Sequence, residues 1–190
     1  MVFAKIGSLF ESIRFKLLSL FIFFKLKPNH LTLGGGIVCI FAGIVAGFGF
    51  YMIAGFVFLF GSSLDAFDGA LARRINEETK FGAFLDSVTD RLGEGTLLLG
   101  VLYYESSNGD PGTAFIVALA LFTSLLVSYV RARGESLALE PRGGIAPRQV
   151  RVPIMVAALF LPSMLQFAML LISILSFITV IQRSLKAYKG

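Results

Sequence analysis

Long apolar runs alternate with short polar segments along this chain, and the pattern predicts helices long enough to cross a bilayer. Residues 31–64 contain no charged side chain, and one span needs about 20 mainly apolar residues. The run therefore suffices for two spans, and we expect them to be joined at Gly47-Phe48-Gly49. Tyr51 follows this glycine-rich turn, which suits an aromatic residue at the membrane interface.

Two further apolar runs follow the first pair. A third span is predicted from Gly82 to the neighbourhood of Tyr103-Tyr104, and acids interrupt its first half. Residues 105–112 contain Asn-Gly and Pro-Gly, dipeptides that favour turns. A fourth run covers residues 113–130, so we expect a polar turn between the third and fourth spans.

The last apolar stretch, residues 152–182, is too long for one ordinary span and short for two. Pro162-Ser163 lies near its middle, so we predict a fifth helix that starts around Pro147 and a separate sixth helix. With six spans and an inside N-terminus, all 17 Lys and Arg fall on one side of the membrane, as the positive-inside rule expects. Five spans would place the cations of the C-terminal tail on the other side.

The predicted fold class is an all-α polytopic membrane protein, in which residues 1–190 form one domain. Residues 29–188 are expected to form a bundle of six transmembrane helices. Segment 2–24 has apolar residues at helical spacing, interspersed with charges, so we predict an N-terminal amphipathic juxtamembrane helix at the headgroup boundary. A signal peptide is the other interpretation, but the segment runs into Lys25-Leu-Lys27-Pro28 rather than a small-residue cleavage site.

Composition agrees with a membrane protein. Only 15% of the residues are charged and 56% are hydrophobic, whereas soluble domains have roughly 25% charged residues. The net charge of +5 would suit nucleic acid or lipid headgroups, and the one-sided distribution of the cations favours the bilayer and no nucleic acid. We expect a multi-pass protein of the cell (plasma) membrane. Cys39 is the one cysteine, which excludes an intrachain disulfide.

Four aspartates, Asp65, Asp68, Asp86 and Asp90, lie at the inner ends of the second and third predicted helices. Intramembrane carboxylates are costly and indicate function. Spacings of three and four place each pair on one helix face. Because the connecting loop is short, we expect the two helices to be antiparallel neighbours whose acids converge. A hard divalent cation, Mg²⁺ or Mn²⁺, would compensate their charge.

Two other interpretations of the acids stay open at this point. One is a solvated helix-end network in which the acids pair with Arg73, Arg74 and Arg91. The other is a small cation transporter in which the acids line an ion path. The transporter is disfavoured because the acids occupy only the inner helix ends, with nothing charged continuing toward the outer face.

The acids belong to a longer pattern, Asp65-x2-Asp68-Gly69-x2-Ala72-Arg73-x8-Gly82-x3-Asp86-x3-Asp90. Here the chain resembles the CDP-alcohol phosphatidyltransferase family, whose signature it matches at all eight fixed positions. The resemblance implies a membrane enzyme, commonly a homodimer, that transfers a phosphatidyl-type group from a CDP-linked lipid to an alcohol and releases CMP.

By this resemblance, Asp65, Asp68 and Asp86 are metal ligands for two ions. Asp90 is the general base that takes the acceptor's hydroxyl proton, and it also belongs to the metal set. A hydroxyl of high pKa needs such a base within hydrogen-bond reach. The site is expected at the cytoplasmic face.

The same signature implies a nucleotide site. Gly69, Gly82 and Ala72 would leave room for the CDP group, although small residues also let membrane helices pack closely. Arg73 has forked donors suited to a diphosphate. Asn29 is interpreted as a helix N-cap. The residues that the resemblance assigns to CDP binding are Asn29, Thr32, Asp68, Gly69, Ala72, Arg73 and Gly82.

The acceptor side is indicated by arginines after the fourth span. The region around Ser128-Tyr-Val-Arg131 and Gly144-Ile-Ala-Pro-Arg148 looks like phosphatidylinositol-phosphate and archaetidylinositol-phosphate synthases. In them, a basic residue matching Arg131 and arginines matching Arg148 and Arg183 form a pocket for the phosphate of inositol phosphate. The predicted acceptor is therefore a phosphorylated alcohol, with inositol phosphate favoured. Glycerol 3-phosphate, the acceptor of phosphatidylglycerophosphate synthase, would need the same basic pocket, and ordinary inside charges remain the alternative for each arginine.

Overall fold

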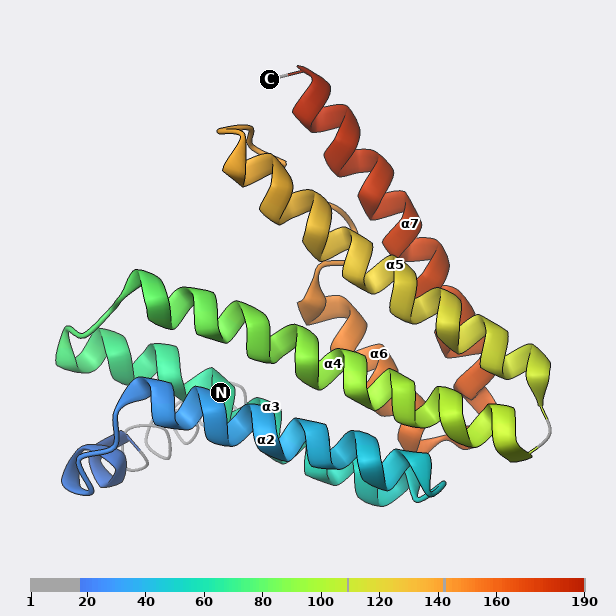
Figure 1. Ribbon diagram of the computed structural model, residues 1–190, viewed down its shortest axis with the longest axis horizontal. Helices are drawn as coiled ribbons and strands as arrows, with labels where there is room; N and C mark the ends of the chain where they lie inside the picture. Colours follow the sequence, from blue (N-terminus) through green and yellow to red (C-terminus); the bar gives the residue numbers. More distant parts are fainter. Residues whose placement is uncertain (1–17, 109, 142, 190) are drawn as a thin grey trace, which may run out of the picture.

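The computed structural model describes residues 18–108, 110–141 and 143–189, without the side chains of Asp65, Ala66 and Lys189, and this part is entirely helical in its regular structure (Figure 1). The predicted interfacial helix over 2–24 lies outside the described residues, apart from residues 18–24. The helices are α2 (Pro28–Gly47), α3 (Tyr51–Ile75), α4 (Lys80–Asn108), α5 (Pro111–Ser136), α6 (Arg148–Phe160) and α7 (Leu165–Lys189), with a 3-10 turn at Pro162–Met164.

The helix ends follow local backbone chemistry. Helix α2 begins at Pro28, a residue suited to the first helical position because its missing N–H needs no partner there. The expected N-cap at Asn29 is therefore wrong, since Lys27 occupies that position. Gly49 has a φ of 82° in the turn before α3, and a side chain there would collide with the ring of Tyr104.

Helix α5 starts at a side-chain cap. The Asp110 carboxylate accepts hydrogen bonds from the backbone N–H groups of Gly112 and Thr113, and from the Thr113 hydroxyl at 2.5 Å. These bonds, led by the one from the Thr113 hydroxyl, hold the pKa of Asp110 below its usual range. Further along the chain, Pro162 separates α6 from α7, because proline cannot donate a backbone hydrogen bond. The predicted break is confirmed.

Helix α2 lies between α3 and α4 and packs against both, whereas α3 and α4 contact each other little. The expectation that α3 and α4 are close antiparallel neighbours is therefore wrong. The reason is a glycine crossing of α2 and α4, in which a side chain on Gly100 would overlap the carbonyl oxygen of Gly43. Bare glycine faces let membrane helices approach closely, and α2 takes the place beside α4.

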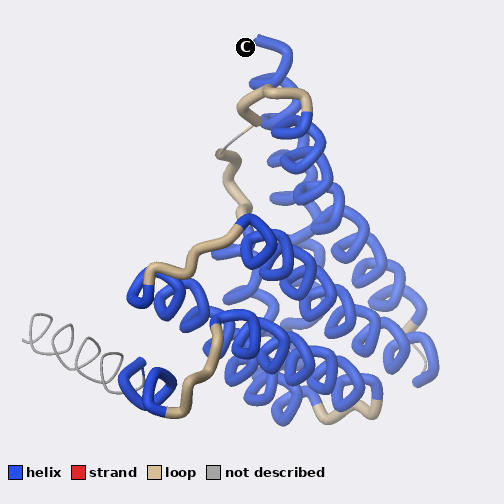
Figure 2. The backbone as a smooth tube through the Cα atoms, turned by 60° about the vertical axis from the view of Figure 1, so that its left-hand side comes forward, coloured by secondary structure: helices blue, strands red, loops and turns tan. Residues whose placement is uncertain are grey.

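The second half of the chain forms another layer. Helix α5 packs along α7 and meets α4, while α6 makes its close contacts with α3 and α7. Figures 1 and 2 show α4 and α5 close together at their short connection and diverging toward their other ends. Phe58, Leu97, Leu159 and Met169 fill the core between these layers.

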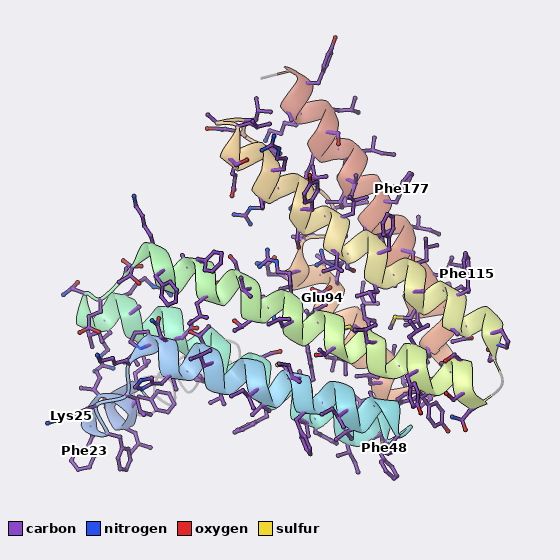
Figure 3. The ribbon with its side chains drawn as sticks, in the orientation of Figure 1. Phe23, Lys25, Phe48, Glu94, Phe115 and Phe177 are labelled. Carbon is purple, nitrogen blue, oxygen red and sulfur yellow. The ribbon has the colours of Figure 1, made fainter. Side chains whose placement is uncertain are left out.

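The outer surface of the bundle is apolar. Phe48, Phe115 and Phe177 project outward in Figure 3, and each is more than half exposed. Four of the described segments are long and apolar enough to cross a membrane: Pro28–Gly47, Tyr51–Ile75, Pro111–Ser136 and Pro162–Tyr188. The 13 residues of α6 fall short of a full span. A surface of this kind suits contact with lipid rather than water.

Candidate active site

A small cavity of about 200 Å³ lies where α2, α3 and the start of α4 meet. Its wall contains every residue that the sequence assigned to nucleotide binding: Asn29, Thr32, Asp68, Gly69, Ala72, Arg73 and Gly82. The sequence did not assign Glu77, Glu78 and Thr79 to this site, although they also line it. They belong to the loop between α3 and α4, whose position depends on the fold.

The floor of the small cavity is polar and ordered by a side-chain contact between two helices. Thr32 of α2 donates its hydroxyl hydrogen to the carboxylate of Asp68 on α3. Both residues are buried, with exposures of 2% and 7%. A buried carboxylate needs such partners because leaving its oxygens unpaired is costly. The bond therefore fixes the direction of Asp68 at the cavity wall.

The two signature glycines face side chains rather than the backbone of a neighbouring helix. A Cβ on Gly69 would meet Arg73 at 3.4 Å, and one on Gly82 would meet Thr79 Oγ1 at 3.1 Å and Asn29 Oδ1 at 3.3 Å. All of these neighbours are side chains of the cavity wall. The tight crossing of α2 and α4 uses other glycines, Gly43 and Gly100.

The carboxylates connect this cavity to a second one. Asp68 lines only the small cavity, Asp90 only the large one, and Asp86 lines both. Asp68 interacts electrostatically with Asp86 and Asp90. Among the residues with described side chains, no three acids, histidines or cysteines are gathered closely enough to hold a metal ion. Asp65 lies in α3, and its side chain is outside the described part.

The large cavity, of about 1210 Å³, lies between the diverging parts of α4 and α5 and reaches α6 and α7. Its wall contains all three arginines that the sequence assigned to the acceptor: Arg131 from α5, Arg148 from α6 and Arg183 from α7. Arg91 of α4 also lines it. Because the candidate base Asp90 faces the same space, a basic surface and a carboxylate share one cavity.

The three predicted arginines differ in their partners. Arg148 Nη1 lies 2.6 Å from Asp90 Oδ1. Arg131, whose side chain is 51% exposed, pairs with Glu135 at 3.0 Å. Arg183 is buried and donates to two backbone carbonyls, those of Gly143 at 2.9 Å and Val127 at 2.7 Å. Arg183 therefore also holds together the wall of the cavity.

Sequence reasoning missed the partner of one arginine. Arg151 of α6 forms a buried ion pair with Glu94 of α4, with 3.0 Å between Nε and Oε1 and between Nη2 and Oε2. A signal was available, because Glu94 follows Asp90 by one helical turn and Arg151 follows Arg148 by nearly one turn. The spacing within each helix could not show that α4 and α6 face each other.

The fold and the two cavities define a helical membrane protein in which a small cavity lined by carboxylates adjoins a larger one lined by arginines. The sequence profile of the CDP-alcohol phosphatidyltransferase family matches residues 25–182, and the chain belongs to this family. It is thus a membrane enzyme, a transferase that moves a phosphatidyl-type group from a CDP-linked lipid to an alcohol. The class indicated by the signature is confirmed, and the transporter interpretation is not supported.

Named relatives share most of the chain. It is 37% identical to the archaetidylinositol phosphate synthase of Methanothermobacter thermautotrophicus, over 86% of this chain and 84% of that protein. The crystal structure of Mycobacterium tuberculosis phosphatidylinositol phosphate synthase with CDP-DAG bound superposes with a TM-score of 0.88 at 26% identity, covering 93% of this chain and 94% of the other. The same enzyme in complex with manganese and citrate gives 0.86 at 27% identity, covering 91% and 88%.

Proposed function

We propose that this enzyme transfers a phosphatidyl-type phosphate group, diacyl or archaeal diether, from a CDP-linked lipid to a hydroxyl of inositol phosphate and releases CMP in phospholipid biosynthesis. The arginine-lined cavity adjoining the small carboxylate-bearing cavity carries this proposal. The names of the relatives support the same acceptor, since the archaeal relative is an archaetidylinositol phosphate synthase and the structural neighbour is a phosphatidylinositol phosphate synthase.

The small cavity is the proposed site for the CDP group of the donor. Gly69, Ala72 and Gly82 leave the space, Asn29 and Thr32 offer polar contacts, and Arg73 supplies forked donors for the diphosphate. The structural neighbour with CDP-DAG bound supports a CDP-lipid donor. We expect the lipid chains to extend into the bilayer.

The carboxylates suit hard divalent cations, because Mg²⁺ and Mn²⁺ prefer oxygen ligands. Asp65, Asp68, Asp86 and Asp90 would hold them, and we propose two ions, Mg²⁺ or Mn²⁺. Bound ions would supply charge stabilisation to the diphosphate and its leaving group. The manganese complex of the structural neighbour supports this assignment.

Asp90 is the proposed catalytic base. Its carboxylate faces the large cavity, where it would accept the proton of the attacking hydroxyl. The hydroxyl oxygen forms a bond to the lipid-bearing phosphorus, the phosphoanhydride bond breaks, and its electron pair leaves with CMP. Arg148, 2.6 Å from Asp90, and Arg131 would bind the phosphate of the acceptor and bring its hydroxyl to this base. Arg183 completes the wall of the pocket.

We further propose the arrangement of the protein in its membrane. Six helices cross or enter the bilayer, residues 1–190 form one domain, and the site opens at the cytoplasmic face of the plasma membrane. The loops of residues 76–79 and 137–147 lie at the same helix ends as the site, and both connect helices that line it. A homodimer, as the family resemblance implies, is the proposed assembly.

The test is an assay of CMP release by the purified protein with CDP-lipid and Mg²⁺ or Mn²⁺. Inositol phosphate should support CMP release, whereas free inositol and serine should not. Activity with glycerol 3-phosphate in place of inositol phosphate would reassign the enzyme as a phosphatidylglycerophosphate synthase. CMP release with serine alone would refute a phosphorylated acceptor.

A further inference from the structure

Two ion pairs join α4 to α6 side by side. Asp90 of α4 pairs with Arg148 of α6 at 2.6 Å, and Glu94 pairs with Arg151 through two contacts of 3.0 Å. Residues three or four apart lie on one helix face, so the two ion pairs lie about one helical turn apart between the same two helices. Figure 3 shows Glu94 on the side of α4 that faces α6.

The Glu94–Arg151 pair is the more deeply buried of the two. Arg151 is 2% exposed and Glu94 is 6% exposed. The third guanidinium nitrogen of Arg151, Nη1, donates to the carbonyl oxygen of Ala146 at 3.0 Å. All three nitrogens of Arg151 are thus engaged by the protein, although the residue lines the large cavity. Arg151 is therefore held in place by the protein itself.

The segment that precedes α6 is held from the opposite side by α7. Ile145 N–H donates to Gln182 Oε1 at 3.1 Å, and Ala146 N–H donates to Thr179 Oγ1 at 2.9 Å. Together with the Arg151 bond to the Ala146 carbonyl, these contacts fix the backbone that leads directly into Arg148. The start of α6 is anchored both to α7 and, through Arg151, to α4.

From these contacts we infer that Glu94 and Arg151 are positioning residues, which hold Arg148 against Asp90 at the wall of the acceptor cavity. This inference rests on the proposed function of that cavity. Helix α6 has 13 residues, too few for the bilayer to fix its depth. Its close contacts are with α3 and α7, so its register on α4 depends on long side chains. Apolar contacts are non-directional, whereas a bidentate arginine–carboxylate pair fixes orientation.

The test compares the Michaelis constants for the two substrates. Glu94→Gln and Arg151→Lys weaken the pair, and we expect the KM for inositol phosphate to rise on the order of tenfold, because small misplacements of a binding group are costly. The KM for CDP-lipid should stay within about twofold, since the nucleotide cavity does not contain either residue. A residue with a purely structural role would lower the yield without changing one KM selectively.

A single substitution leaves a buried charge unpaired and can prevent folding. The double variant Glu94→Leu/Arg151→Met removes both charges and keeps the volume, and buried pairs can often be replaced in this way without loss of stability. It should fold and show the same selective rise in acceptor KM. Tyr51→Phe is the matched control, because it removes a 2.5 Å bond to Glu105 at the far end of α4. The control should leave both Michaelis constants unchanged.

Arg148→Ala, measured in parallel, separates this inference from the proposed function. If Arg148→Ala raises the acceptor KM and the folded double variant does not, the positioning role is overturned while the acceptor site stands. If Arg148→Ala leaves the acceptor KM unchanged, the proposed acceptor site itself is refuted. Equal changes in both Michaelis constants of the double variant would also overturn the positioning role.

Discussion

The arginines around the large cavity carry the same charge but have different surroundings. Arg151 donates to Glu94 and to a backbone carbonyl, and Arg183 donates through two of its nitrogens to backbone carbonyls. Arg131 and Arg148 are paired with carboxylates at the cavity wall, and an incoming phosphate can compete for such donors. Some of the inner arginines thus hold the wall together, and Arg131 and Arg148 are the ones proposed to bind the ligand.

Asp86→Ala tests the carboxylate that the two cavities share. We expect kcat to fall roughly 10²- to 10³-fold, a loss typical of removing one group that stabilises charge in the transition state. Calorimetric titration with Mn²⁺ should show weaker binding. Glu105→Gln, an acid at the other end of the same helix, is the control and should keep both properties. Undiminished metal binding in Asp86→Ala would contradict the assignment.

Arg148→Ala tests the acceptor site. A hydrogen bond to a charged group contributes about 1.5–3 kcal/mol, so the KM for inositol phosphate should rise about 10- to 100-fold. The KM for CDP-lipid should change little, because Arg148 is not part of the small cavity. Steady-state assays with each substrate varied in turn measure both constants. The reverse pattern would move Arg148 to the nucleotide site.

For single residues, the signature with fixed spacing picked out Gly69, Arg73 and Gly82, which line one cavity, and their contact with a nucleotide stays a prediction. It could not predict the Glu94–Arg151 pair, whose members are far apart in the chain and lie on helices that only the fold brings together. The N-cap at Asn29 was wrong because Pro28 starts the helix one residue earlier.

Between elements, the glycine crossing decides which helices are neighbours. The sequence predicted an all-helical structure with breaks near Gly49 and Pro162, since apolar runs and turn residues mark them directly, whereas four of the described segments are long and apolar enough to cross a membrane. It predicted α3 next to α4 from their short loop, whereas Gly43 and Gly100 bring α2 against α4. Glycines at a crossing and glycines at a ligand site look alike in a sequence, so only the fold separates them.

Gly100→Ala tests this crossing. The added methyl group would overlap the backbone of α2 at Gly43, and overpacking of this kind costs about 1–3 kcal/mol. Thermal unfolding in detergent should therefore show a lower apparent Tm. Gly34→Ala is the matched control, because nothing lies within 4 Å of a Cβ at that position. Equal stability of the two variants would argue against the crossing as a determinant of the fold.

For the whole molecule, the proposed six-span topology predicts which loops face which side. Single cysteines placed in a Cys39→Ser background report this through a membrane-impermeant thiol reagent. Cysteines at Glu78 and Ala138 should react only from the cytoplasmic side, whereas those at Ser107 and Ser163 should react from outside. Labelling of Ser163→Cys from the cytoplasm would refute six spans, because α6 and α7 would then not return the chain across the bilayer.

The wall common to the two cavities has a kinetic consequence. Ala83 and Asp86 line both spaces, so a bound nucleotide and a bound alcohol phosphate would be separated by about one turn of α4 and could react without an enzyme-linked intermediate. Such geometry favours a ternary complex, which gives intersecting lines in double-reciprocal plots, and a single in-line displacement inverts the configuration at phosphorus. Parallel lines, the signature of a ping-pong scheme, would mean that the two ligands never occupy the two cavities at the same time.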